Sequence, residues 1–487
     1  MSESGRKENV LLQVLRFNQK GNGVGDVFIK DQNISVEIPF AIPGDTFEAP
    51  LSNIKRKKII CGIENAVITS DSRIKSRCLH FGFCGGCRWQ QMSYADQLHY
   101  KEKFVHRCFS ELLNSNVDVR PIIPCSKEWE YRNKMEFSFS TDAKNKRYLG
   151  LIMDSNRGRV INLTECHLVN PWFVETLDAT RQWWEESLLD AYHPFKDKGS
   201  LRTLVLRESM RTGDRLVMLT VSGNPNYALN KQQIEKFVAA IRKSSEPEDN
   251  NAKLSIFLRI QQAVKGMPTN FYEMLLYGPD HLREILEVQT SPDELPQKLY
   301  FNVSPTAFFQ PNSFQAEVLY STALQMSKLV EGSVVYDLYC GTGTLGICAA
   351  RKVKAVISIE VSPESALDAR TNAVNNNIEN ITILSGAVRH LLKQIKEENQ
   401  YPLPDLVVID PPRSGIDPEA MEGLLNLNAP KILYISCSPQ TQADNIRELL
   451  QNGYKLVSIQ PIDQFAQTPH IENIAILEKR SDNEHFI

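Results

Sequence analysis

Asp337-Leu-Tyr-Cys-Gly-Thr-Gly-Thr-Leu-Gly346 is the stretch that decides the fold of the C-terminal part of the chain. The apolar run at 334–338 predicts a buried strand, and a helix is expected to begin near Thr344. Further strands are predicted at 355–359, 405–410 and 431–435. Because strands and helices alternate in this region, the sequence predicts an α/β domain with a doubly wound parallel sheet.

The glycines of this stretch lie just after a strand and just before a helix. In that position they let the backbone turn sharply and approach a ligand closely. Glu360 ends the next predicted strand and suits an acceptor for ribose hydroxyls. A glycine-rich loop alone also fits dinucleotide-binding proteins. The combination Asp-x-x-Cys-Gly-x-Gly with Glu360 is more specific to S-adenosylmethionine, which we therefore predict as the cofactor.

Two other motifs follow strands of the same predicted sheet. Asp410 begins Asp-Pro-Pro-Arg413, and since prolines cannot continue a strand ladder, Asp410 is expected at the edge of the sheet. Amino-methyltransferases carry an aromatic residue where Arg413 stands, so the motif argues against amine chemistry. Cys437 follows the last predicted strand and reaches the rim where ligands bind. A cysteine there is either a small buried hydrophobe or a nucleophile.

The composition excludes several classes of protein. The chain has 487 residues, of which 42% are hydrophobic and 23% charged, as in a globular protein. No apolar run is long enough to span a membrane and the N-terminus lacks a signal core, so we expect a cytoplasmic protein without membrane association. Between Asn53 and Arg107, eleven basic residues stand against four acidic ones. This basic stretch favours a polyanionic partner, with a merely solvated face as the alternative.

Four cysteines are candidates for a metal centre. Cys78, Cys84 and Cys87 have x5 and x2 spacing, and Cys166 lies farther along the chain. In a chain without an export signal, such cysteines favour metal or catalytic roles over disulfides. Four thiolates suit either zinc or an iron–sulfur cluster, and the spacing does not decide between them. Radical S-adenosylmethionine enzymes use x3 then x2 spacing, which these residues do not match.

Three domains are expected. Residues 1–68 are rich in Val, Ile and Phe between glycine-containing turns, which predicts a small β-barrel. Residues 69–300 mix strand and helix patterns and contain the cysteines, which predicts an α+β central domain. Residues 301–487 form the Rossmann-like domain.

These motifs together resemble the RNA uracil-5-methyltransferase family, and specifically its iron–sulfur branch that modifies 23S ribosomal RNA. The resemblance covers nearly the whole chain. It rests on the motifs above and on four more: Ile38-Pro-Phe-Ala-Ile-Pro-Gly-Asp45, Tyr131-Arg-Asn-Lys-Met-Glu-Phe137, Phe308-Phe-Gln-Pro-Asn312 and His470-Ile-Glu472. It implies an OB-like TRAM barrel that binds RNA, a class I methyltransferase domain, and a [4Fe–4S] cluster held by Cys78, Cys84, Cys87 and Cys166.

The resemblance also implies the chemistry. A methyl group from S-adenosylmethionine would go to C5 of a uridine, with Cys437 as the nucleophile that adds to C6. Glu472 would be the base that removes the C5 proton. Asp410 is assigned to the same site, where it would contact the uracil edge or orient the nucleophile. The residues that match cofactor-binding positions are Gln310, Tyr339 and Glu360, and Asp410 is grouped with them as a cofactor-binding residue.

Two alternatives stay open. A transfer-RNA enzyme acting on the T-loop is the first, but that branch generally lacks the barrel and the cysteines, so a monomeric 23S ribosomal RNA enzyme is preferred. The second is an RNA-binding or maturation factor without catalysis. Ser438, where the family usually has Asn, and Gly386, where an Asp contacts adenine, favour it. The presence of Cys437 and Glu472 weighs against it.

Overall fold

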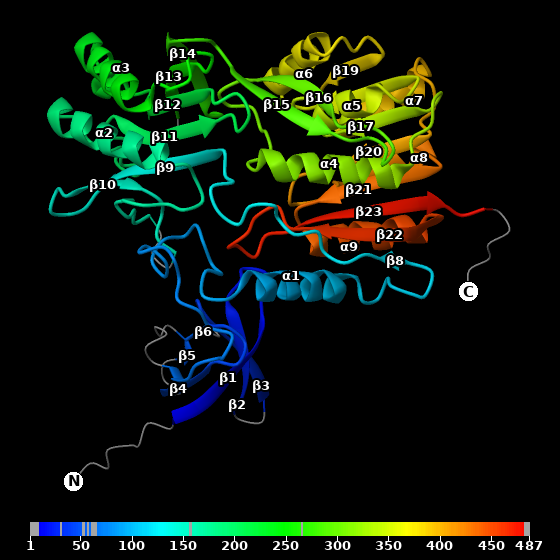
Figure 1. Cartoon of the computed structure of the whole chain (residues 1–487), viewed down its shortest axis with the longest axis horizontal. Coiled ribbons are helices and arrows are strands. Elements are labelled where there is room, and N and C mark those ends of the chain that lie inside the picture. Colours follow the sequence, from blue (N-terminus) through cyan, green and yellow to red (C-terminus); the bar gives the residue numbers. More distant parts are fainter. Residues whose placement is uncertain are drawn as a thin grey trace.

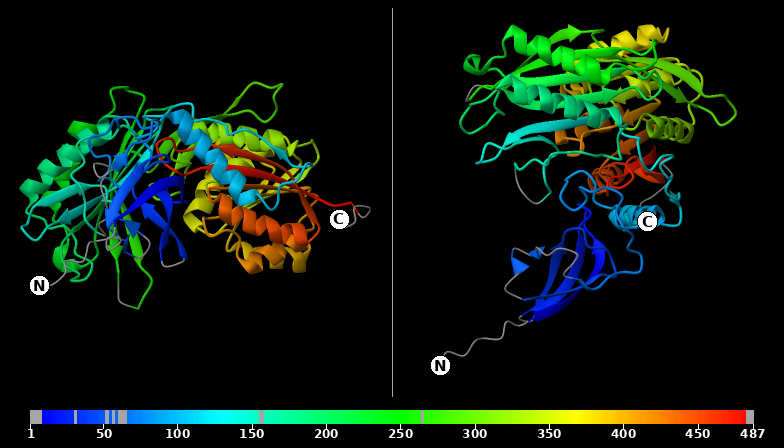
Figure 2. Two further views of the ribbon diagram at one scale, coloured as in Figure 1. Left: turned by 90° about the horizontal axis from the view of Figure 1, so that it is seen from below. Right: turned by 60° about the vertical axis from the view of Figure 1, so that its left-hand side comes forward.

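The structure is a computed structural model that describes residues 9–29, 32–50, 54–55, 58–59, 66–154, 158–263 and 266–481. Figure 1 shows a small N-terminal β module beside a broad body, in which a central and a C-terminal sheet lie next to each other. The right-hand view of Figure 2 shows the same module standing apart from the body. Within the described ranges, no helix is long and apolar enough to cross a membrane.

The C-terminal sheet carries the candidate site. Its described strands are β17 (Val334–Leu338), β18 (Ala355–Glu360), β19 (Ile381–Ser385), β20 (Leu406–Ile409), β21 (Lys431–Ser436), β22 (Tyr454–Ile462), β23 (Glu472–Lys479) and β8 (Asp118–Val119). They are ordered β19-β18-β17-β20-β21-β23-β22-β8. β17 to β21 are mutually parallel, which confirms the predicted Rossmann-like sheet.

The sheet departs from the parallel arrangement at one edge. β23 lies antiparallel between β21 and β22. The connection between β22 and β23, residues 463–471, is too short for the helical crossover that parallel neighbours require. As a result, the beginning of β23 lies at the same edge of the sheet as the end of β21, where Ser436 pairs with Asn473.

Helices cover both faces of this sheet. The described helices are α1 (Tyr94–Phe109), α4 (Ser313–Ser327), α5 (Thr344–Ala350), α6 (Pro363–Asn375), α7 (Val388–Glu398), α8 (Pro418–Leu427) and α9 (Pro439–Gln451). One buried apolar core joins α4, α5 and α6 to the sheet, and the other joins α1, α7, α8 and α9 to its opposite face. α1 and β8 thus pack on the C-terminal sheet although they precede residue 301, and the predicted three-domain division stays a prediction.

The central part is a second, mixed sheet with two helices. Its strands are β9 (Lys134–Thr141), β10 (Arg147–Gly150), β11 (Leu201–Glu208), β12 (Arg215–Ser222), β13 (Leu254–Gln262) and β14 (Asn270–Tyr277), in the order β10-β9-β11-β12-β13-β14. α2 (Trp172–Ser187) and α3 (Lys231–Ser245) pack on it through a core that includes Phe137 and Trp184. The 3₁₀ helix at Pro225–Tyr227 precedes α3.

A hairpin connects the central part to the C-terminal sheet. It consists of β15 (Leu282–Val288) and β16 (Gln297–Val303). The backbone N–H of Asn302 donates to the Asn372 side chain of α6 at 2.7 Å. The backbone N–H of Tyr300 donates in the same way to Asn376 at 2.9 Å. These bonds fix the hairpin against the C-terminal helices.

The N-terminal module consists mainly of strands. They are β1 (Asn9–Phe17), β2 (Gly23–Ile29), β3 (Gln32–Ile38), β4 (Thr46–Pro50), β5 (Ile54–Lys55), β6 (Lys58–Ile59) and β7 (Ala66–Ile68), in the order β5-β6-β3-β2-β1-β4-β7. Leu12 and Val14 alternate with exposed residues of β1 and face a small core. The closed OB-like barrel stays a prediction.

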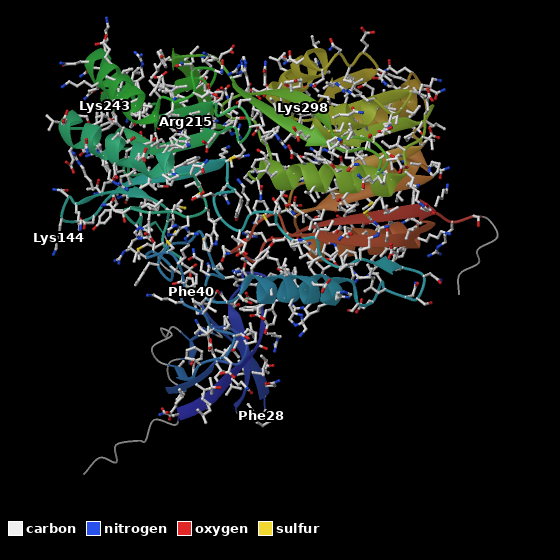
Figure 3. The ribbon with its side chains drawn as sticks, viewed as in Figure 1. Phe28, Phe40, Lys144, Arg215, Lys243 and Lys298 are labelled. Carbon is white, nitrogen blue, oxygen red and sulfur yellow. The ribbon has the colours of Figure 1, made fainter. Side chains whose placement is uncertain are left out.

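Phe40 lies where this module meets the rest of the chain (Figure 3). Its ring packs edge-on against Phe81 at 5.3 Å between centroids. Its carbonyl accepts hydrogen bonds from the Arg73 and Gln91 side chains, both at 3.2 Å. The module is therefore joined to the cysteine-containing segment by both apolar and polar contacts.

The basic stretch is only partly a surface feature. Arg73 pairs with Asp45 and Arg88 with Asp154, while Lys101 is fully buried. Exposed cations such as Lys103 and Arg107 lie on α1. Arg56 and Lys57 lie outside the described residues.

Candidate active site

A cavity of about 560 Å³ opens at the carboxyl ends of β17, β18, β20 and β21. This edge is where open α/β sheets bind ligands. Each side chain predicted to be catalytic or cofactor-binding lines this cavity: Gln310, Tyr339, Glu360, Asp410, Cys437 and Glu472. Glu472 reaches it because the antiparallel β23 begins at this edge.

The glycine-rich loop and Glu360 are bonded to each other. The Gly341 N–H donates to Glu360 Oε2 at 2.8 Å, and Gly341 has φ 56°, a conformation that favours glycine. The Gly346 N–H donates to Asp337 Oδ2 at 2.9 Å. A Cβ at Gly346 would lie 2.8 Å from Ser358 Oγ, so this position has no space for a side chain. The loop backbone is thereby held close to the cavity.

The polar lining fits a ligand with hydroxyl and amine groups. Tyr339 Oη is buried and has no hydrogen-bond partner among the described residues, although it lines the cavity. A buried hydroxyl without a partner is costly unless a ligand or water pairs with it. Glu360 also accepts from the Ser362 N–H at 2.8 Å and retains acceptor capacity toward the cavity. These residues fit S-adenosylmethionine.

One of the sequence motifs positions two other segments of the site. In the 131–137 motif, the Asn133 side chain donates to the carbonyl of Gln310 at 2.9 Å and to Ser313 Oγ at 2.8 Å. Tyr131 donates to the carbonyl of Ala466 at 2.8 Å, in the connection that leads to Glu472. The motif between the N-terminal and central parts thus fixes both the Gln310 segment and the 463–471 connection.

The candidate catalytic side chains lie in an environment that shifts their pKa values. Burial raises the pKa of Cys437 to about 11, and Glu472 adds to this, whereas Arg413 beside the thiol lowers it. Burial raises the pKa of Asp410 to about 7. Burial, followed by the charge of Asp410, holds the pKa of Glu472 well above its ordinary value. Such a carboxyl is a far stronger base than an exposed glutamate.

The cavity residues that had no role assigned from the sequence include Arg132, Asp337 and His470. Arg132 and His470 belong to motifs that carry the resemblance, which is the signal that identifies them. Arg413 Nη2 lies 3.5 Å from His470 Nδ1. Desolvation and then the charge of Arg413 lower the pKa of His470 to about 4, so its ring is neutral at pH 7. Desolvation raises the pKa of Asp337 to about 7.

Ser438 and Gly386 both take part in local bonding. The Ser438 N–H donates to Ser436 Oγ at 3.1 Å, and its hydroxyl lies 2.9 Å from Thr441 Oγ1. Ser438 therefore braces the turn between Cys437 and α9. The Gly386 N–H donates to the backbone carbonyl of Glu360 at 2.8 Å.

The four candidate metal ligands lie around one small space. Cys78, Cys84, Cys87 and Cys166 all line a cavity of about 20 Å³. Burial raises the pKa of Cys78 and of Cys84 to about 11. The donors match a tetrathiolate site in number and type. Across the described ranges, however, no group of three or more His, Cys, Asp or Glu side chains is arranged to hold a metal ion. The cluster stays a prediction.

Comparison with known proteins identifies the family. A family model described as tRNA (Uracil-5-)-methyltransferase matches residues 271–480. An RNA methyltransferase of Protochlamydia amoebophila is 54% identical over 91% of this chain and 99% of its own length. The chain belongs to the RNA uracil-5-methyltransferase family. Members of this family are enzymes that depend on S-adenosylmethionine.

Two further matches extend over nearly the whole chain. An RNA methyltransferase of Caldanaerobacter subterraneus is 31% identical over 97% of this chain and 99% of its own length. A solved structure, the Pyrococcus abyssi tRNA (uracil-54, C5)-methyltransferase in complex with S-adenosyl-L-homocysteine, has a TM-score of 0.67. It covers 96% of this chain and 100% of its own, and at 24% identity this likeness concerns the fold alone.

Proposed function

We propose that this chain is a cytoplasmic enzyme that methylates C5 of a uridine in 23S ribosomal RNA. The observation that supports this reaction is that Cys437, Glu472 and the glycine-rich loop line the same cavity. A nucleophile, a strong base and a cofactor cradle within one cavity are the parts that methylation of a weakly nucleophilic carbon requires.

Each residue has a defined step in this proposal. The Cys437 thiolate forms a bond to C6 of the uracil, which makes C5 an enolate carbon. S-adenosylmethionine, when bound, supplies the methyl group that C5 takes. Glu472 then accepts the C5 proton, the C6–S bond breaks, and the electron pair of that bond returns to Cys437 as the thiolate. Gln310, Tyr339 and Glu360 hold the cofactor.

A second cavity that also reaches Cys437 supports a separate path of approach for RNA. It measures about 390 Å³ and shares Arg413, Cys437 and His470 with the cofactor cavity. It also contains Lys20, Arg88 and Phe104. Phe104 lines a third groove as well, which adds the exposed cations Lys103 and Arg107. Cations alternating with aromatic rings suit a single-stranded nucleic acid.

One experiment tests the reaction and its substrate. The purified chain is incubated with methyl-labelled cofactor and either unmodified 23S ribosomal RNA or unmodified transfer RNA, and 5-methyluridine is mapped. Label in ribosomal RNA is the expected result. Label in transfer RNA would favour the second candidate, which the name of the Pyrococcus abyssi protein supports. Label in neither RNA would contradict the proposal that the chain is an enzyme and would favour a maturation factor without catalysis.

RNA that contains 5-fluorouridine tests the mechanism. Because fluorine at C5 cannot leave as a proton, the covalent adduct with Cys437 should persist on a denaturing gel. Cys437→Ala should abolish this adduct, whereas Cys108→Ala, a partly buried thiol of α1 that does not line the cavity, should retain it. With ordinary uridine RNA, Glu472→Gln should accumulate the methylated adduct. Rapid turnover by Glu472→Gln would show that Glu472 is not the base.

In the proposed enzyme, Cys78, Cys84, Cys87 and Cys166 hold a [4Fe–4S] cluster. The support is that all four thiols line one cavity and that the chain resembles the iron–sulfur branch. With four protein ligands the irons have no open position, so the cluster would stabilise the segment and take no part in redox chemistry. Zinc is the alternative metal for the same four thiols.

A further inference from the structure

The connection 463–471 is held by an ion pair that is buried completely. Lys101 Nζ on α1 lies 2.6 Å from Asp463 Oδ1, and both side chains are 0% exposed. Tyr94 donates to the other carboxylate oxygen of Asp463 at 2.9 Å. The Phe465 N–H donates to Asp463 Oδ1 at 2.9 Å. Both carboxylate oxygens of Asp463 therefore have partners, which come from α1 and from its own loop.

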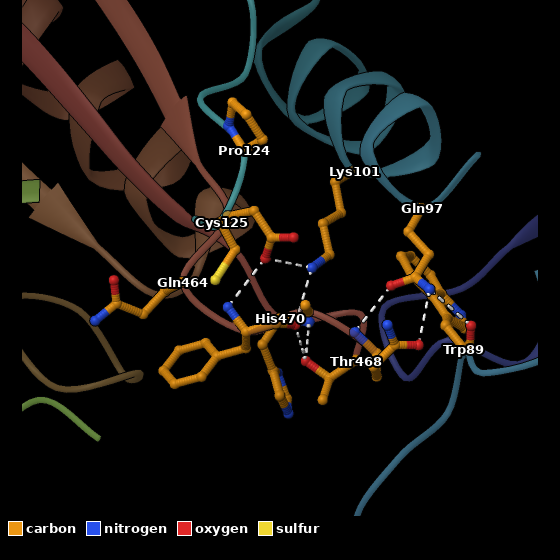
Figure 4. Close-up of polar contacts among 12 residues, drawn as sticks. Trp89, Gln97, Lys101, Pro124, Cys125, Gln464, Thr468 and His470 are labelled. Carbon is orange, nitrogen blue, oxygen red and sulfur yellow. Dashed lines mark hydrogen bonds and ion pairs between the residues drawn. The ribbon is translucent and has the colours of Figure 1, made fainter. Parts of the chain in front are cut away.

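Lys101 also binds the loop backbone directly, as Figure 4 shows. Its Nζ donates to the carbonyl of Phe465 at 3.0 Å, and Thr468 Oγ1 donates to the same carbonyl at 2.8 Å. Thr468 Oγ1 in turn accepts from the His470 N–H at 3.2 Å. A continuous series of hydrogen bonds thus runs from Lys101 to His470, two residues before Glu472.

A second anchor on the same helix face holds the middle of the loop. Gln97 precedes Lys101 by one helical turn, so both side chains point the same way. The Gln97 side chain accepts from the Gln467 N–H at 2.8 Å and donates to Gln467 Oε1 at 3.0 Å. Gln467 has φ 68°, an uncommon backbone conformation for a residue other than glycine. A strained loop conformation persists only where the surrounding structure enforces it.

We propose that Lys101 is a positioning residue, which through Asp463 and the Phe465 carbonyl holds the loop so that Glu472 meets the C5 proton. A buried ion pair adds little net stability, because removing two charges from water costs about as much as their attraction gains. Its use is geometric, since it allows one loop conformation and disfavours others. The proposal rests on the proposed function, in which Glu472 is the base.

The test compares Lys101→Met, Asp463→Asn and the double variant in the full chain. The measurements are kcat and KM for the RNA, affinity for S-adenosyl-L-homocysteine, the thermal midpoint, and methylated covalent adduct on uridine RNA. We expect Lys101→Met to lower kcat by about 10²-fold, as a base displaced by about an ångström does, with KM and cofactor affinity unchanged. The methylated adduct should accumulate, because Cys437 still adds while proton removal is slow.

The double variant separates positioning from stability. It removes the unpaired buried charge left by Lys101→Met, so the thermal midpoint should recover while kcat stays low. Recovery of both would show a purely structural role and overturn the proposal. Unchanged kcat in Lys101→Met, or loss of kcat together with cofactor affinity, would also overturn it. Lys393→Met, an exposed lysine on α7, is the matched control and should behave as the wild type.

Tyr94→Phe keeps the proposal testable if Lys101→Met does not fold. It removes only the hydroxyl that binds Asp463 and the Cys125 N–H. A smaller fall in kcat with some adduct accumulation is expected, and wild-type kcat would overturn the proposal. Failure of the proposed function is distinct, because then the wild type itself makes no 5-methyluridine in either RNA.

Discussion

The side chain of Asn133 donates a hydrogen bond to the carbonyl oxygen of Gln310 at 2.9 Å, across 177 residues of sequence. Asn133 stands just before the central sheet, and Gln310 lines the cofactor cavity. The central part of the chain therefore helps to shape a site that belongs to the C-terminal sheet.

Asn133→Ala should weaken the binding of S-adenosyl-L-homocysteine, although Asn133 does not itself line the cofactor cavity. The substitution removes the bonds to Gln310 and Ser313, each worth about 1 kcal/mol, so affinity should fall by at most about 30-fold. Calorimetric titration measures the change. Asn162→Ala, which loses a bond to Leu149 of β10, should lower the melting temperature but not this affinity. Equal losses in both variants would contradict the prediction.

Gly346→Ala should damage the cofactor loop. The new Cβ would lie 2.8 Å from Ser358 Oγ and 2.9 Å from Asp337 Oδ2, which forces a shift and costs about 1–3 kcal/mol of unfolding free energy. Denaturant unfolding measures this loss. The double variant Gly346→Ala/Ser358→Ala removes one of the clashing atoms and should recover part of the stability. No recovery would point to Asp337 as the contact that cannot adjust.

Adduct formation should accelerate as pH rises. Burial raises the pKa of Cys437 to about 11, so the reactive thiolate is a small fraction at pH 7 and grows about tenfold per pH unit below that pKa. Single-turnover rates of adduct formation with saturating 5-fluorouridine RNA between pH 6 and 9 measure this slope. A rate independent of pH across this window would show that RNA binding had already ionised the thiol.

Arg413→Gln should move that profile toward higher pH. The guanidinium lies beside the thiol and lowers its pKa, so its removal makes the thiolate scarcer at every pH below the pKa. The rate at pH 7 should therefore fall while the dependence on pH keeps its sign. Arg447→Gln, a surface arginine of α9 paired with Asp444, is the control and should leave the profile in place. A profile shifted to lower pH would contradict the electrostatic role of Arg413.

The four-cysteine cavity should yield a coloured protein when the chain is purified without oxygen. A [4Fe–4S] cluster absorbs near ~400 nm and brings about four irons per chain. Cys84→Ser should lose this absorption, whereas Cys108→Ser should keep it. Chelation should lower the melting temperature, because metal binding free energy contributes to folding. A colourless protein with one zinc per chain would identify the other metal that four thiols accept.

Local sequence patterns, which span only a few residues, were enough to predict many of the strands and helices of this protein and the position of its cofactor loop. The stretch 337–346 predicted strand, loop and helix, because glycine conformations and apolar runs act locally. Cys437 and Asp410 were placed at a common rim, since both follow parallel strands. Glu472 is different, because it reaches that rim only through the antiparallel direction of β23. The alternation of apolar residues that identifies a strand does not specify whether the strand pairs parallel or antiparallel with its neighbour.

Lys101 shows what only the tertiary structure decided. In the sequence it is one cation of a basic stretch, which favoured a polyanionic partner and left a solvated face as the alternative. In the fold it is wholly buried against Asp463, which lies 362 residues away. No local pattern includes both residues, and a lysine is buried only where a distant carboxylate compensates the loss of its hydration. The sequence by itself therefore determined the parallel strands around the cofactor loop, the loop itself and the candidate catalytic residues, whereas long-range packing determined how they are held.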